Sequence, residues 1–149
     1  MNAVHSTLSQ TLENPVKKAA VVRDGFQLIE DEVARKRGLR GYALKAGYKV
    51  VKRVKPDIIH RALDGLLPRF APVIDPFLDK ARVDGDVEGY FDRNRSDIAE
   101  AMLSVTDGRA KKAKNPVLVR AYLGLRHQAK GHVEEAVPGL ARLILKHVA

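Results

Sequence analysis

The sequence predicts an all-α protein, a compact bundle of about six to eight helices, several of them short and bounded by proline. Apolar residues recur at steps of three and four, which is the period of one helix face. Asn-Pro pairs and glycines stand where helices begin and end. No stretch alternates polar and apolar residues for long, as a half-buried strand would. We therefore expect a single helical domain over residues 1–149, with residues 1–13 as a loosely ordered N-terminal segment.

The first two long helices are predicted from local signals at their ends. A helix over Pro15–Arg37 starts with Asn14 as its cap and proline in the first position. It stops at Gly38, after three basic residues that suit the negative end of the helix dipole. A second helix is predicted over Leu39–Val54, because the residue before Pro56 disfavours helical backbone.

The middle of the chain is rich in proline. A third helix is predicted to begin near Asp57, but prolines then recur every four residues, at Pro68, Pro72 and Pro76. Each proline removes one backbone hydrogen bond from a helix. We therefore expect short turns here, followed by a helix that restarts with Asp75 as its cap.

Two further helices are predicted in the last third of the chain. One begins at Asn94 or Ser96 and ends near Asp107-Gly108. The other begins at the second Asn-Pro pair, at residues 115–116, and is broken or restarted by Pro138. The polar segment between them is predicted to be a connector or a frayed helix end.

Charge is distributed unevenly along this chain of net charge +9. Residues 39–56 hold six basic residues and no acidic one, for a net charge of +6. Residues 57–108 hold six basic and eleven acidic residues, net −5, and residues 109–149 hold nine and two, net +7. Two basic segments therefore flank an acidic one, and this asymmetry is the most informative feature for function.

The basic segment 39–56 predicts an amphipathic helix. At 100° per residue, Lys45, Lys49 and Lys52 fall on one side. The opposite face carries Leu39, Ala43, Ala46, Val50 and Val54. Gly47 and the small residues near it are expected to let another helix approach closely.

The basic faces suggest contact with a polyanion, without readout of individual bases. A charged face on a surface helix is also commonly just solvated. Two further alternatives are an anionic membrane surface and a homo-oligomer in which the acidic and basic segments pair. The candidate anion-binding residues are Arg40, Lys45, Lys49, Lys52, Arg53, Lys55, Lys111, Lys112 and Lys114.

The acidic segment 83–95 has spacings that partly match a calcium loop. Its oxygen ligands would be Asp84, Asp86, Glu88 and Asp92. The twelfth position, where such a loop needs a bidentate Glu, is Arg95. We therefore interpret the segment as a turn followed by a helix start, in which Asp86 is the cap and the following aromatic residues pack inward.

Other signals limit the classes of function. The chain has no cysteine, so disulfides and thiolate sites are excluded. Its N-terminus lacks the pattern of a signal peptide, and no apolar run is long enough to span a bilayer. No nucleotide-binding glycine motif, metal-binding histidine motif or nucleophile motif occurs. His60 and Asp64 are spaced to pair on a helix, which is more often a surface contact than a catalytic one.

Three stretches carry a resemblance to a known group of proteins: AGYKVVKRVKP, LLPRF and MLSVTD. Together they resemble an uncharacterised family of small all-helical bacterial proteins. This resemblance implies a helical fold and no particular activity. From the residues we expect a cytoplasmic accessory protein rather than an enzyme, with no cofactor, whose partner is a nucleic acid or other polyanion.

Overall fold

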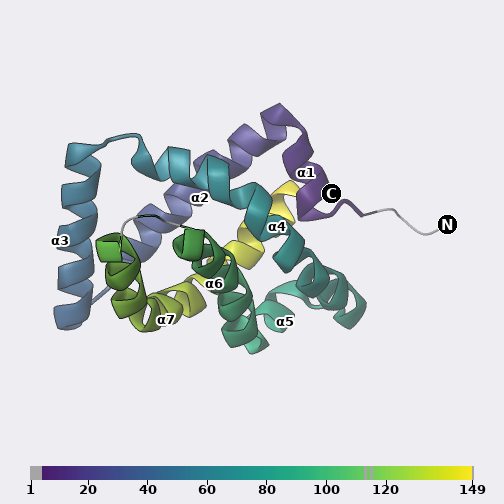
Figure 1. The fold of residues 1–149 in the computed structure, drawn as a ribbon. Helices are drawn as coiled ribbons and strands as arrows, with labels where there is room; N and C mark the ends of the chain where they lie inside the picture. Colours follow the sequence, from purple (N-terminus) through teal and green to yellow (C-terminus); the bar gives the residue numbers. More distant parts are fainter. Residues whose placement is uncertain (1–4, 113, 115, 149) are drawn as a thin grey trace. The chain divides into compact units, whose positions relative to one another are not determined.

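The chain is all-α, as predicted. The computed structural model describes residues 5–112, 114 and 116–148, and these form seven helices and no strand (Figure 1). The helices are α1 (Leu8–Glu13), α2 (Pro15–Arg35), α3 (Gly38–Val54), α4 (Ile58–Asp84), α5 (Val87–Arg93), α6 (Arg95–Lys112) and α7 (Pro116–His147). None of the helices in these residues is long and apolar enough to cross a membrane.

The chain divides into two units, each with its own internal packing. Unit 1 comprises residues 1–68 and 143–149, and unit 2 comprises residues 69–142. That the whole chain behaves as a single domain stays a prediction.

The N-terminal part of unit 1 is built on two helix caps. Thr7 and Gln10 form a reciprocal capping box at the start of α1, and Leu8 and Leu12 are buried. Residues 8–13 are thus helical, where the sequence suggested a loose segment. Asn14 caps α2 by accepting hydrogen bonds from two backbone N–H groups, as its pairing with proline predicts.

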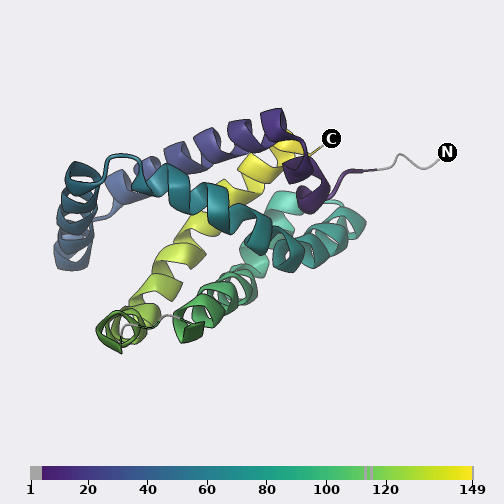
Figure 2. The ribbon, with the colours of Figure 1, turned by 45° about the horizontal axis from the view of Figure 1, so that its top comes forward.

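Helix α2 packs along the first part of α4, and Figure 2 shows the two running side by side. A Cβ at the buried Gly25 would lie 3.6 Å from the Leu63 side chain, so the helices are in close contact here. His60 stacks on Phe26, with 4.2 Å between ring centroids. Asp64 pairs with Lys18 at 3.2 Å, so His60 and Asp64 each contact a side chain of α2.

The end of α7 completes unit 1. The Asp24 carboxylate lies 2.6 Å from Nε2 of His147 and 2.9 Å from Nζ of Lys146. Its hydrogen bond to Lys146, and then the one to His147, lower the pKa of Asp24 below its ordinary value. The carboxylate therefore fixes the last turn of α7 against α2.

The prediction of short turns around the prolines is wrong. Pro68, Pro72 and Pro76 all lie within the continuous helix α4, and all three are exposed. The carbonyl groups that lose their partners can thus be hydrated. The opposite face carries a buried row at steps of three and four residues: Leu67, Ala71, Ile74, Leu78 and Ala81. Burial of that row stabilises the helix enough to offset the missing hydrogen bonds.

Two other predicted helix ends in unit 2 are also overridden. Helix α6 continues past Asp107-Gly108 to Lys112, and Pro138 lies inside α7. Val137 and Leu140, on either side of that proline, are buried. Tertiary packing again outweighs a local helix-breaking signal.

Candidate anion-binding surface on helix α3

A tight junction positions α3 against the end of α2. Gly38 has φ +75°, a left-handed conformation that suits glycine. One turn later Gly41 is buried against the backbone of Lys36, where an added Cβ would lie 2.7 Å from the carbonyl carbon. Gly47, which the sequence suggested as the site of close approach, has no atom within 4 Å of its would-be Cβ. The close contact therefore occurs at Gly41, and Gly47 faces open space.

A groove of about 540 Å³ separates α2 from α3 within unit 1. Lys52 of α3 lines the groove and forms an ion pair with Glu30 of α2. The Lys52 ammonium also lies 5.6 Å from the Phe26 ring centroid and 5.3 Å from that of Tyr48. Although Lys52 belongs to the predicted anion-binding set, its charge is therefore already matched inside the fold.

Tyr48 forms the buried part of the groove. Burial, and then the neighbouring Glu30 carboxylate, raise the pKa of Tyr48 to about 12. Its hydroxyl therefore stays protonated throughout the physiological range, and the oxygen itself is buried from solvent.

The remaining basic residues of α3 behave differently from Lys52. All of them are exposed, and within the described part of the chain none forms an ion pair. Lys45 and Lys49 also line the groove. This set, the α3 cations, comprises Arg40, Lys45, Lys49, Arg53 and Lys55.

An exposed apolar stripe runs beside these cations. Helix α3 packs through Gly41, Leu44 and Tyr48, which are buried or half-buried. The predicted apolar face is therefore turned outward, and Leu39 and Val54 are 91% and 71% exposed. We call this face the α3 stripe; its members are Leu39, Ala43, Ala46, Val50 and Val54.

A second basic cluster lies in unit 2. Arg69 of α4 and Arg109 and Lys112 of α6 surround a depression of about 440 Å³. Among the predicted residues, Lys111 lies near Asp107, whose pKa its charge helps to lower, and Lys114 is an exposed residue of the connector. Arg69 was missed because its proline-rich surroundings hid the continuous helix that places it beside α6.

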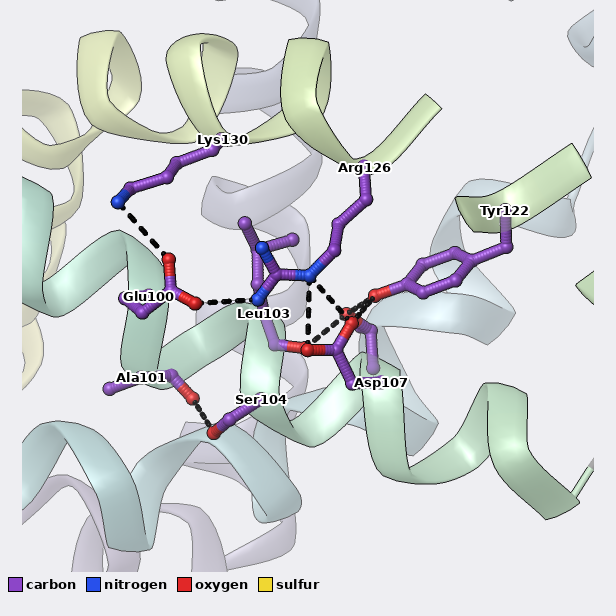
Figure 3. Close-up of polar contacts among 9 residues, drawn as sticks. Glu100, Ala101, Leu103, Ser104, Asp107, Tyr122, Arg126 and Lys130 are labelled. Atoms are coloured by element: carbon purple, nitrogen blue, oxygen red, sulfur yellow. Dashed lines mark hydrogen bonds and ion pairs between the residues drawn. The ribbon is translucent and has the colours of Figure 1, made fainter. Parts of the chain in front are cut away.

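Helices α6 and α7 are joined by a polar network centred on Asp107 (Figure 3). Arg126 Nε donates to both Asp107 oxygens, at 2.8 and 3.0 Å, and the Tyr122 hydroxyl donates to Oδ1 at 2.6 Å. Arg126 also pairs with Glu100 at 2.7 Å. The hydrogen bond from Arg126, followed by that from Tyr122, lowers the pKa of Asp107. The network thus ties the part of α6 before Gly108 to α7.

Replacing Asp107 by alanine is expected to lower the free energy of unfolding by about 1–2 kcal/mol, because the half-exposed carboxylate loses its hydrogen bonds to Arg126 and Tyr122. The folded-state pKa of Asp107 is depressed, so its contribution is present above pH ~4 and disappears as the pH falls through the folded value. The difference in the free energy of unfolding between the variant and the wild type should therefore be smaller at acidic pH. Urea unfolding at pH 7 and pH 3 measures this, with the exposed Asp79→Ala as control. A gap that is unchanged at pH 3 would contradict the assignment.

The acidic segment is a turn and a helix start. Asp86 caps α5 by accepting from the Gly89 N–H at 3.0 Å, and Phe91 is fully buried. Asp84 pairs with Arg93 at 3.1 Å, and Glu88 lies in the first turn of α5, where the dipole favours it. Asp92 lies 3.9 Å from Arg95. Among the described residues, no group of three or more acidic or histidine side chains is arranged to hold a metal ion.

The fold and the site define an all-helical protein with an exposed, cationic and partly apolar helix. The model of a family of unknown function, DUF6918, matches residues 8–148, and the chain belongs to this family. The predicted resemblance to an uncharacterised helical family is thereby confirmed. Neither the curated proteins nor the solved structures gave a match.

Proposed function

We propose that the protein binds an anionic membrane surface through α3. The observation that supports this most directly is the position of the α3 stripe, which is exposed and bordered on both sides by cations that form no ion pair with the described residues. At 100° per residue, Arg53 borders the stripe on one side and Arg40 on the other. An anionic bilayer offers phosphates to the cations and an apolar interior to the stripe.

The absence of acidic residues over 39–56 supports the same proposal. Polybasic segments gain roughly 1 kcal/mol for each Lys or Arg near an anionic leaflet. Exposed apolar side chains would add to this when they enter the interface. Because the cytoplasmic leaflet is the anionic one in cells, we propose a cytoplasmic location for this activity.

A nucleic acid is the second candidate partner, and the cluster in unit 2 favours it. Arg69, Arg109 and Lys112 form no ion pair with any described residue and surround a shared depression. Phosphates of a nucleic acid backbone would be complementary to such a cluster. They would leave the α3 stripe in water, however, and for this reason we rank the membrane first.

Self-association through α3 is a weaker alternative. Two α3 stripes placed face to face would bring two acid-free helices together, so that the α3 cations of one copy would repel those of the other. A dimer of this kind should therefore form more readily as salt screens the repulsion, whereas the cationic contribution to membrane binding should weaken.

Co-sedimentation with vesicles tests the proposal. We expect binding to phosphatidylglycerol vesicles and little to phosphatidylcholine vesicles, with affinity falling as salt rises. Duplex DNA and RNA are titrated in parallel over the same salt series. Binding to nucleic acid alone would replace the membrane proposal by the second candidate. Equal binding to both kinds of vesicle would contradict a role for the cations. Binding to neither kind would contradict the membrane proposal.

A further inference from the structure

The groove between α2 and α3 is lined mainly by apolar surface and is large enough for a small molecule, and contact with a flat membrane requires neither feature. It is lined mainly by apolar surface, to which Val33 and Ala34 of α2 and Ala46 of α3 contribute. Its volume of about 540 Å³ lies within the range of roughly 300–1,000 Å³ typical of small-molecule sites. An apolar groove of this size fits a molecule rather than a single ion.

The charged residues of the groove are not equivalent. Lys52 is neutralised by its ion pair with Glu30 and held over two aromatic rings. Lys45 and Lys49 also line the groove, but they are exposed and form no ion pair with the described residues. The net charge left for an occupant is therefore positive and concentrated at these two lysines.

We propose that the α2–α3 groove binds a single amphiphilic anion, whose apolar chain lies along Val33, Ala34 and Ala46 and whose anionic head pairs with Lys45 and Lys49. Charge complementarity selects the head, since Glu30, the one carboxylate among the described lining residues, is already paired with Lys52. The apolar walls select the chain, because an inorganic anion would leave them in water. The protonated Tyr48 hydroxyl adds no charge that would repel an anion.

This inference does not require that the protein binds membranes. A free fatty acid and an anionic membrane lipid share the chemistry of an apolar chain with an anionic head. The two sources are distinguished by offering an anionic amphiphile free in solution, as dodecanoate, and in a bilayer, as phosphatidylglycerol vesicles.

Calorimetric titration with dodecanoate, below its micellar concentration, tests the groove directly. We expect saturable binding of one molecule per chain. Dodecan-1-ol, which has the chain without the charge, should bind at least tenfold more weakly, and inorganic phosphate should not bind in the groove. Equal binding of the alcohol, or absence of dodecanoate binding, would overturn the proposal.

Two variants test whether dodecanoate binds in the groove and pairs with its lysines. Ala34→Phe fills the groove from α2, at an exposed position where the larger side chain displaces no core residue, and should weaken dodecanoate binding more than tenfold. Ala19→Phe, exposed on the same helix but outside the groove, is its control. The double variant Lys45→Gln/Lys49→Gln should lose roughly two- to fivefold for each lysine, and Lys17→Gln/Lys80→Gln is the matched control.

The same variants separate the groove from the membrane surface. Ala34→Phe leaves the α3 stripe and the α3 cations intact, so it should retain binding to phosphatidylglycerol vesicles. If it abolishes vesicle binding as well as dodecanoate binding, the occupant is a bilayer lipid rather than a soluble amphiphile. If dodecanoate binding is the same in Ala34→Phe and in wild type, the groove is not the site and the inference fails, whatever the vesicles show.

Discussion

Replacing Leu39, Val50 and Val54 by serine is expected to reduce binding to anionic vesicles about a hundredfold. Burying a valine or leucine side chain completely contributes about 1.5–3 kcal/mol. Burial of about half of each side chain at the interface gives roughly 1 kcal/mol for each residue, hence about 3 kcal/mol in total. The three side chains are 91%, 59% and 71% exposed, so the substitutions should leave the free energy of unfolding nearly unchanged.

A matched control removes the same kind of surface elsewhere. Val16, Val83 and Leu123 are 79%, 90% and 63% exposed and lie on α2, α4 and α7. Their triple replacement by serine lowers the exposed apolar surface by a similar amount without touching α3. Vesicle binding should therefore persist in this control. If both triple variants lose binding equally, general hydrophobicity rather than the α3 stripe is responsible.

Substitution of Gly41 by alanine is expected to have the largest effect on the position of α3. The new Cβ would lie 2.7 Å from the Lys36 carbonyl carbon and 2.9 Å from its Cβ, distances that force the backbones apart. Alanine favours a helix by about 0.5–1 kcal/mol over glycine, but overpacking of this kind costs about 1–3 kcal/mol. We expect a net loss of about 1–2 kcal/mol in the free energy of unfolding.

Gly47→Ala, on the same helix, is the control, and its expected effect on the free energy of unfolding has the opposite sign. A Cβ there meets no atom within 4 Å, so alanine should stabilise the protein by about 0.5–1 kcal/mol through helix propensity alone. Urea unfolding midpoints, with unchanged m-values, measure both variants. Stabilisation by both substitutions would mean that α3 does not pack against Lys36 as described. Displacement of α3 in Gly41→Ala should also weaken dodecanoate binding, whereas Gly47→Ala should leave it intact.

The sequence by itself was sufficient for features that depend on near neighbours along the chain. The caps at Asn14 and Asp86 and the helical turn that contains Glu88 follow from side chains that bond to backbone a few residues away. The all-α class follows from the apolar period, and the +6 charge of residues 39–56 follows from counting. Counting along the chain also shows that Arg95 stands where a calcium loop needs a bidentate Glu.

Only the tertiary structure decided which of these features face solvent. Periodicity placed Leu39, Val50 and Val54 on one face of α3. It did not determine whether that face is buried, because burial depends on what packs against the helix. The close approach of Gly41 to Lys36 turned the stripe outward. Glu30, 22 residues before Lys52, pairs with that lysine, which is why Lys52 is not one of the α3 cations. Arg69 likewise joined the basic cluster only because buried side chains hold α4 helical through three prolines. Contacts between residues distant in sequence determine exposure and pairing, and local propensities do not encode such contacts.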